Sequence, residues 1–451
     1  MVGVVLRNRV VGALRLAGIV TALALLAYGA VKLAEPGGGL LAHATYLVRV
    51  ARQARCAPLA TAPLGAPSAL SACLTYNGDA RRDLLEWVVH HRLHGVARFD
   101  VFWDVVGAYN ATRHADFLAA LQPLLHGAGG DVFAWSKADI GPLVERIAAA
   151  TAAAAAARNS GGGACAPTSA DLEDLAARAR TCLAPGASWE CQATVNAICL
   201  AAAKVRGDEW LGLFDVDEFF FAPGRPQREN ACFWGGAPGH ATDEGAAFVA
   251  TPASCVVPVA EAPLLTGRDI ASVLQRYSPL VSSVVVEGVV FGMVANHSRE
   301  GLVLAAHGRA ALMDAEGFLV PPPDFSRESC PDWFCGLMTP KKSFVRVAHA
   351  PVAGLRVHHH DTGPFAVERP ARGAQLRLNH YAFDDRASVV RRQSTHRYFG
   401  NNIFKGLLEN REGVADYMTA AADESGRALV PLVEHCMAPQ HREEAMCRAP
   451  R

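Results

Sequence analysis

The chain has 451 residues, of which 51% are hydrophobic, and its 43 basic and 43 acidic side chains give a formal net charge of zero. A chain of this length can bury a large core, in one domain or in two or three smaller ones. The neutral balance argues against nucleic acid as a partner, because nucleic-acid-binding proteins concentrate positive charge on one surface.

The first predicted element is an apolar N-terminal segment. Basic residues ending with Arg15 precede an uncharged run from Leu16 to Val31, which is long enough to cross a membrane once the apolar residues before Arg15 are counted. The basic residues predict a cytoplasmic tail. The alternative is a cleaved signal peptide with a weak cleavage site at Ala27–Gly29. We expect a tail and signal anchor over residues 1–34 and a stem rich in proline and glycine over 35–68.

Both alternatives place the rest of the chain in the secretory pathway. Its twelve cysteines suit an oxidising lumen, and Asn110 and Asn296 each begin an N-glycosylation sequon. Cys330 and Cys335 would form either a small disulfide staple or half of a zinc site. Disulfide connectivity cannot be deduced from the spacing. Three further cysteines lie close together in the sequence, at Cys182, Cys191 and Cys199.

A globular domain is predicted from residue 69 to residue 402. It begins with a strand near Ser71–Tyr76, a helix over 82–94 and a strand at Arg98–Trp103, an order typical of a parallel sheet. We therefore predict an α/β fold with a mixed, mainly parallel sheet flanked by helices. The later elements are an alanine- and glycine-rich insertion over about 145–165, a helical region over 171–205, a strand at Ser283–Val290 and a helical extension over 403–451.

The residues that carry chemistry lie in an apolar run from Trp210 to Phe221, which is predicted as one buried strand. Three acids interrupt it: Asp215, Asp217 and Glu218. Buried carboxylates need a compensating charge, and a divalent cation can supply it. Residues two apart in a strand share a face, so Asp215 and Asp217 would converge on such a cation while Glu218 faces away. The alternative is an acidic strand end in a solvated turn.

Several blocks in their order along the chain resemble glycosyltransferase family 92, whose members have a nucleotide-diphosphosugar (GT-A) fold. The block order covers about residues 70 to 400 and is more specific than any one block. The matching blocks are Leu84–Asp104, the DVDEF run Asp215–Phe219, Phe291–Gly292, Arg299–Val303, Lys342–Arg346, Val357–His360 and Asn379–Tyr381.

The resemblance implies roles for individual residues. A Mn²⁺ ion, or Mg²⁺, would be held directly by Asp217 and by a late histidine that best matches His358, while Asp215 would bind the ribose, or the metal through a water. Lys342 and Arg346 would either clamp phosphate or solvate a surface strand, and His380 would close over the diphosphate. The nucleotide would lie against Asn77, Asp79 and Asp104, while Glu86 and Trp87 would either touch it or anchor their helix. The unranked candidates for the catalytic base are Glu300, Asp332 and Asp384.

The resemblance therefore implies an inverting, metal-dependent glycosyltransferase. It would move a hexose, with galactose from UDP-galactose as the expected donor, onto a glycan acceptor. We expect a single-pass type II protein of the Golgi membrane with a lumenal catalytic domain. One alternative is an inert lumenal protein of the same fold that binds glycans or nucleotide-sugars. Another is a metal-dependent phosphoryl or nucleotidyl hydrolase, although the sequence lacks the extra clustered acids of a two-metal site.

Overall fold

The structure is a computed structural model. It describes residues 64, 67–76, 81–103, 132–157, 166–184, 189–221, 270–277, 281–292, 302–306, 309–310, 341–352, 355, 366–369, 376–381, 421–422, 429–441, 444 and 447. The chain divides into two compact units, Met1–Cys56 and Ala57–Arg451, and all described residues belong to the second. The predicted anchor and most of the predicted stem lie outside the described residues. Among the helices that are described, none has both the length and the apolar character needed to span a membrane.

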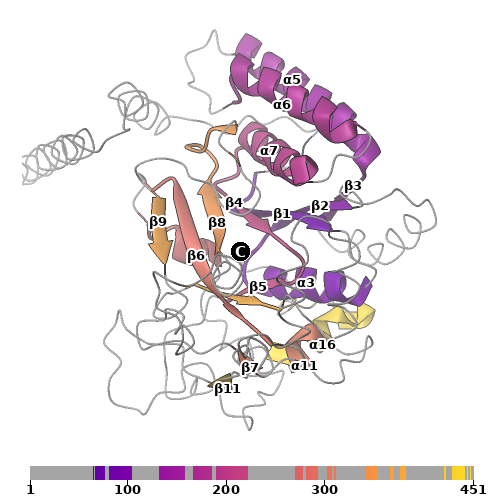
Figure 1. The fold of residues 1–451 in the computed structure, drawn as a ribbon, viewed down its shortest axis with the longest axis vertical. Helices are drawn as coiled ribbons and strands as arrows, with labels where there is room; N and C mark the ends of the chain where they lie inside the picture. Colours follow the sequence, from indigo (N-terminus) through magenta and orange to yellow (C-terminus); the bar gives the residue numbers. More distant parts are fainter. Residues whose placement is uncertain are drawn as a thin grey trace, which may run out of the picture. The chain divides into compact units, whose positions relative to one another are not determined.

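The described residues form a mixed nine-stranded sheet (Figure 1). Its strand order is β3-β2-β1-β4-β8-β6-β10-β5, with β9 also paired to β6. Strands β8 and β5 run against the others, so the sheet is mainly parallel, as predicted. The strands are β1 (Leu70–Tyr76), β2 (Arg98–Trp103), β3 (Val132–Trp135), β4 (Trp210–Phe214), β5 (Glu218–Phe221), β6 (Ser283–Val290), β8 (Lys341–Arg346), β9 (Ala366–Arg369) and β10 (Arg377–His380). A separate pair joins β7 (Arg309–Ala310) to β11 (Ala421–Ala422).

Helices cover both faces of this sheet, which confirms the α/β prediction (Figure 1). The predicted first strand, helix and second strand are all present. The predicted helical region over 171–205 is two helices, and the alanine tract is helical up to Ala157. The helices are α3 (Arg81–Leu93), α5 (Ile140–Ala157), α6 (Ser169–Leu183), α7 (Trp189–Arg206), α10 (Ile270–Leu274), α11 (Val303–Ala306) and α16 (Val430–Met437), with 3₁₀ turns η2 (Lys137–Asp139) and η8 (Pro439–His441).

The core divides into two apolar clusters, one on each face of the sheet. Successive strand residues point to opposite faces, and β4 shows the result: Trp210 and Phe214 belong to the cluster that includes α3 and α16, whereas Leu211 and Leu213 belong to the cluster that includes α5, α6 and α7. Because both faces of β4 are covered, its sequence is apolar throughout rather than alternating.

Side chains of α3 occupy the outer edge of β5, the last strand in the sheet order. The indole Nε1 of Trp87 donates to the carbonyl of Glu218 at 2.8 Å, and His90 Nε2 lies 2.8 Å from the carbonyl of Phe220. The backbone N–H of Phe220 donates to His91 Nε2 at 3.1 Å. An edge strand otherwise presents unpaired backbone groups, so α3 fixes β5 as a neighbouring strand would.

The histidines of α3 are neutral because they are buried. Burial lowers the pKa of His91 to about 3 and that of His94 to about 4, and burial with the neighbouring histidines lowers the pKa of His90 well below its usual range. Since His91 Nε2 accepts from Phe220, the ring proton is on Nδ1, which donates to the carbonyl of Trp87 at 2.9 Å. The helix therefore requires uncharged imidazoles.

The amino ends of the parallel strands carry a buried ion-pair network, which we call the arginine network: Arg98, Asp100, Arg206 and Asp208. Arg98 donates to both oxygens of Asp100 at 3.1 Å, and Arg206 Nη2 bridges Asp100 at 3.2 Å and Asp208 at 2.6 Å. The side chains of Arg206, Asp100 and Asp208 are at most 4% exposed. Two cations face two anions, so the network is balanced.

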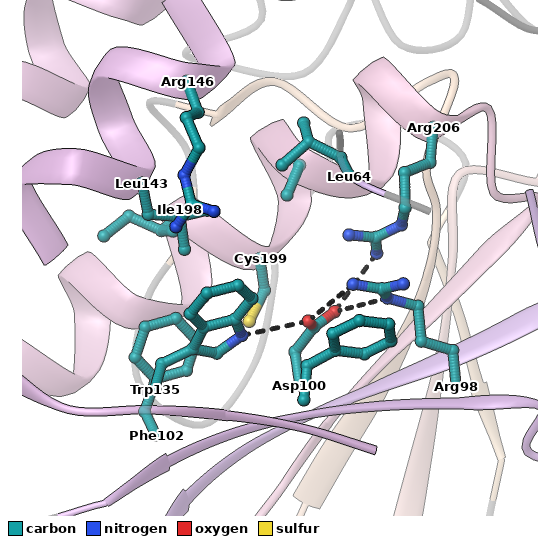
Figure 2. Close-up of a pocket in the computed structure, with 12 residues that line it drawn as sticks. Leu64, Arg98, Asp100, Phe102, Trp135, Leu143, Arg146, Ile198, Cys199 and Arg206 are labelled. Atoms are coloured by element: carbon teal, nitrogen blue, oxygen red, sulfur yellow. Dashed lines mark hydrogen bonds and ion pairs between the residues drawn. The ribbon is translucent and has the colours of Figure 1, made fainter. Parts of the chain in front are cut away.

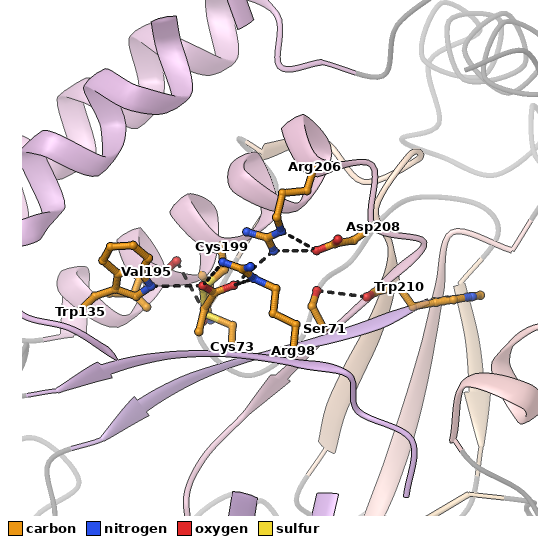
Figure 3. The surroundings of a disulfide bond; sticks show 11 residues. Ser71, Cys73, Arg98, Trp135, Val195, Cys199, Arg206, Asp208 and Trp210 are labelled. Carbon is orange, nitrogen blue, oxygen red and sulfur yellow. Dashed lines mark hydrogen bonds and ion pairs between the residues drawn. A yellow bond between two sulfur atoms is a disulfide. The ribbon is translucent and has the colours of Figure 1, made fainter. Parts of the chain in front are cut away.

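Disulfides fix the helices that surround this network. Cys73 of β1 is bonded to Cys199 of α7 beside the arginine network (Figure 3). Cys182 and Cys191 join the end of α6 to the start of α7. The third pair is Cys436–Cys447, and every cysteine among the described residues is in one of these three bonds. Disulfide bonds, expected from the sequence, are therefore present among the described residues, whereas Cys330 and Cys335 lie outside them.

Candidate functional site

The acidic cluster, Asp215, Asp217 and Glu218, lies where β4 ends and β5 begins. The prediction of one continuous strand from Trp210 to Phe221 was wrong, because the chain turns between Phe214 and Glu218. Strand β4 is parallel to β1, whereas β5 is antiparallel to β10, and the Glu218 N–H donates to the Asp215 carbonyl at 3.1 Å across the turn. Asp215 and Asp217 therefore lie in a turn at the carboxyl end of β4, and Glu218 begins β5.

Lys342 of β8 supplies the buried counter-charge for two of these acids. Its ammonium lies 2.5 Å from Asp215 Oδ2 and 3.2 Å from Glu218 Oε2, and its side chain is 3% exposed. Burial alone would lower the pKa of Lys342, but the two carboxylates outweigh it and raise the pKa, so the amine is charged. Of the two roles expected for Lys342, surface solvation is excluded by this burial.

Glu218 faces Asp215 and not the opposite side of a strand, which corrects the predicted orientation. Its Oε2 accepts the backbone N–H of Asp215 at 2.9 Å as well as the Lys342 ammonium. Burial and the nearby charges of Asp215 and Asp217 raise the pKa of Glu218 well above its usual range, against the opposing effect of Lys342. The reason for the changed orientation is the turn, since side-chain alternation applies only within a strand.

Asp215 is held on both of its oxygens. Gln192 of α7 donates from Nε2 to Oδ1 at 2.9 Å, while Lys342 binds Oδ2. Its side chain is still 26% exposed, and each carboxylate oxygen can accept a second hydrogen bond. The carboxylate is therefore fixed in orientation and open on one side.

Asp217 faces His380 at the end of β10. The distance from His380 Nε2 to Asp217 Oδ1 is 3.7 Å, and both side chains are 16% exposed. The backbone holds this geometry, because the Tyr381 N–H donates to the Asp217 carbonyl at 2.8 Å and His380 is paired with Glu218 in the β10–β5 register. A carboxylate oxygen and an imidazole nitrogen at this separation, both partly open, are a donor pair that suits Mn²⁺ or a similar divalent cation.

Arg346 is at the other end of β8 from Lys342. It stacks over Trp210 with 4.3 Å between the guanidinium carbon and the ring centroid, donates to the carbonyl of Val281 at 3.1 Å, and lies 3.3 Å from Glu209. Arg346 is four positions along extended chain from Lys342, which is roughly 13 Å. The structure therefore brings Asp215, Asp217, Lys342 and His380 together and leaves Arg346 out.

The remaining predicted site residues lie outside the described residues. They are Asn77, Asp79, Asp104, Glu300, Asp332, His358 and Asp384.

Sequence reasoning missed the roles of Gln192 and of the Asp217–His380 pair, and it left Glu86 and Trp87 undecided. Glu86 accepts the backbone N–H groups of Val303 and Leu304 at 2.8 and 2.9 Å, at the start of α11, and Trp87 bonds to β5. Both residues anchor their helix. No local signal marks Gln192, because it enters the site from the distant helix α7.

A cavity of about 230 Å³ opens elsewhere, beside the arginine network (Figure 2). Trp135 Nε1 donates to Asp100 at 3.2 Å there, and Arg98 lies 3.7 Å from the centroid of Phe133. None of the residues that line this cavity belongs to the acidic cluster, which follows the carboxyl end of β4. The cavity is therefore separate from the acidic cluster. Of its charged groups, Arg98, Asp100 and Arg206 are paired with one another, and Arg146 lies over the Trp135 ring.

No model of a known protein family matches this chain, and no curated protein matches it either.

Proposed function

We propose that the protein is a metal-dependent glycosyltransferase that uses a nucleotide-sugar donor, with UDP-galactose as the expected one. The observation that carries the proposal is the position of the acidic cluster in the sheet. The chain builds β1, β2 and β3 outward on one side and then places β4 on the other side of β1. Ligands of open α/β sheets bind at such a switch point, beyond the carboxyl ends of the strands, and Asp215 lies directly after β4.

The residues present fit a divalent cation. Asp217 and His380 would hold it, with His358 as the further ligand that the resemblance implies. When bound, the ion would neutralise the charge that grows on the leaving diphosphate. Asp215, oriented by Gln192 and Lys342, would accept hydrogen bonds from the ribose. The base that deprotonates the acceptor hydroxyl would come from Glu300, Asp332 or Asp384.

One observation favours the alternative of an inert lumenal binding protein. Lys342 already compensates Asp215 and Glu218, as a lysine does in sites that hold no cation. The single ammonium of Lys342 does not balance the cluster, however: it pairs with Asp215 and Glu218, and Asp217 lies against His380 instead. The cluster therefore has an excess of carboxylates over cations that a divalent cation would neutralise. For either alternative, the twelve cysteines and the apolar N-terminal run support a lumenal domain anchored in the Golgi membrane.

The test is nucleotide release by the purified chain from a panel of nucleotide-sugars with Mn²⁺ and a mixture of glycan acceptors. Asp217→Asn should lower the rate by about 100- to 1,000-fold, as loss of one charge-stabilising group does, with the unfolding midpoint unchanged. Asp174→Asn is the matched control, because Asp174 is an exposed aspartate on α6 paired with Arg178; its rate should equal the wild-type rate.

The outcomes separate the candidates. Turnover of one donor that requires both the metal and Asp217 supports the transferase. Donor binding without turnover, measured by calorimetry, supports the inert binding protein. If no nucleotide-sugar binds, both the transferase and the binding-protein proposals are wrong. Release of nucleotide at the same rate with and without acceptor would identify a hydrolase.

A further inference from the structure

The C-terminal segment contains a second group of ligating side chains, the C-terminal cluster: His435, His441 and Glu444. It lies after the last element of the sheet, from α16 through η8. One ligand atom from each residue lies within 4.8 Å of the other two. This cluster shares no residue with the acidic cluster of the candidate active site.

The local backbone explains why these residues meet. The N–H of Ala438 donates to the carbonyl of His435, His441 to Ala438, Glu444 to His441, and Cys447 to Glu444, at 3.0 to 3.2 Å. Each bond spans three residues, which is the 3₁₀ pattern, and residues three apart in that pattern lie on one side. His435, His441 and Glu444 are spaced by multiples of three.

Glu444 already contacts both histidines. Glu444 Oε2 lies 2.8 Å from His435 Nε2, and its Oε1 lies 2.6 Å from His441 Nδ1. The two imidazole rings are stacked, with centroids 3.9 Å apart. Glu444 therefore bridges one nitrogen of each of the two stacked rings.

The two separations from Glu444 are close to those that zinc requires, and the two histidine nitrogens lie within 4.8 Å of each other. Zn–N and Zn–O bonds of about 2.0–2.2 Å in a tetrahedron place neighbouring ligand atoms roughly 3.3–3.5 Å apart. The hydrogen-bonded distances would open by less than about 1 Å, a movement that partly exposed side chains can make. Two histidines and one glutamate are a known zinc donor set, and a water can take the fourth position.

The segment that carries the C-terminal cluster is anchored in the apolar core. Cys436, next to His435, is bonded to Cys447, three residues beyond Glu444, and both cysteines are buried in the apolar core. Leu432 and Val433 of α16 belong to the same core cluster as α3. The disulfide closes a short loop that contains His441 and Glu444, so little entropy is lost when the ligands are ordered around an ion.

We propose that His435, His441 and Glu444 form a zinc site on the surface of the lumenal domain. The site is independent of the proposed transferase chemistry, since its ligands come from one continuous C-terminal segment. A bound ion would replace the two hydrogen bonds of Glu444 with three coordinate bonds and would stabilise the turn between α16 and Cys447.

The test is Zn²⁺ binding to the purified full-length chain, measured by competition with a chelating dye, with Co²⁺ absorption in the visible as a report of coordination geometry. Glu444→Gln and His441→Asn should each lower the affinity of one site by more than about 100-fold, because even changes to outer-shell partners cost about 10- to 100-fold. Glu434→Gln is the matched control, since Glu434 is an exposed glutamate on the same helix that lies outside the cluster.

Each outcome is decisive. One Zn²⁺ per chain that is lost in Glu444→Gln and His441→Asn, and kept in Glu434→Gln and Asp217→Asn, supports the site. Unchanged Zn²⁺ affinity in both cluster variants overturns it, as does loss of zinc in Asp217→Asn alone, which would place the ion at the acidic cluster. The affected side chains are partly exposed, and an unchanged far-ultraviolet circular dichroism spectrum shows that the variants fold.

Discussion

Buried charge is balanced near the amino ends of the parallel strands, here called the amino edge. It is unbalanced beyond their carboxyl ends, here called the carboxyl edge. At the amino edge, Arg98 and Arg206 balance Asp100 and Asp208, and the network is closed to solvent. At the carboxyl edge, Lys342 faces an excess of carboxylates, and Asp215, Asp217 and His380 remain partly open. A balanced, closed network needs nothing further and serves the fold, whereas an unbalanced, open one favours a bound cation.

The largest loss of unfolding free energy is expected from a substitution in the arginine network at the amino edge. Although burial raises the pKa of Asp100, Arg206 and Arg98 outweigh it and hold the pKa below its ordinary value, so the carboxylate is charged. Asp100→Asn would leave two buried guanidiniums with one carboxylate and should cost about 3–5 kcal/mol of unfolding free energy. Urea denaturation measures this, and Mn²⁺ should restore none of it. A loss below about 1 kcal/mol would show that the network is not a structural element.

A smaller loss of unfolding free energy, which Mn²⁺ should partly restore, is expected from a substitution of Lys342 at the carboxyl edge. Lys342→Met keeps the length of the side chain and removes its charge, which should cost about 2–4 kcal/mol, less than at Asp100 because Asp215 is partly solvated. Mn²⁺ at ten times its dissociation constant should return about 1.4 kcal/mol. The comparison between the edges fails if Mn²⁺ stabilises the Asp100 variant as much as the Lys342 variant.

The histidines of α3 are a third kind of buried group, because they must be neutral in the folded chain. Their pKa values are lower in the folded chain than in the unfolded chain, so the unfolded state binds more protons below pH of about 6.5. Stability should be complete above that pH and fall as the pH drops toward about 4 for His94 and about 3 for His91, by up to about 1.4 kcal/mol per pH unit for each group. Urea denaturation between pH 7.5 and 5 measures the slope.

His91→Gln is the control for this slope. A glutamine can donate and accept hydrogen bonds as His91 does, but it does not titrate. The variant should lose up to about 1.4 kcal/mol per pH unit of the acid dependence. An unchanged slope would mean that His91 titrates equally in both states and is not buried as described.

The smallest change in unfolding free energy is expected for the ion pair of Glu209 with Arg346 at the surface. Glu209 is 41% exposed and pairs with Arg346 at 3.3 Å, while Arg346 is also held by Trp210 and by carbonyls. Glu209→Gln should therefore change the unfolding free energy by less than about 1 kcal/mol, because exposed ion pairs contribute little. A change as large as that of Asp100→Asn would remove the distinction between closed and open charges.

The sequence by itself determined the early fold and predicted which acidic residues need a buried counter-charge. The strand–helix–strand order around α3 and the apolar β4 follow from hydrophobic patterns, which depend only on neighbours along the chain. The acids at 215, 217 and 218 were identified because carboxylates in an apolar run need a counter-charge. The number of cysteines predicts an oxidising compartment, but it does not predict which cysteines are partners.

Only the tertiary structure decided which groups supply that charge and which side chains face each other. Lys342, Gln192 and His380 come from β8, α7 and β10, and the register of those strands with β4 and β5 is a long-range property that no local window contains. The turn after Phe214 likewise follows from the opposite directions of β4 and β5, and it reversed the expected orientation of Glu218. The Cys73–Cys199 bond, 126 residues apart in sequence, required the packing of α7 on β1. Sequence patterns report the environment of a residue, whereas its partners are set by how distant elements pack.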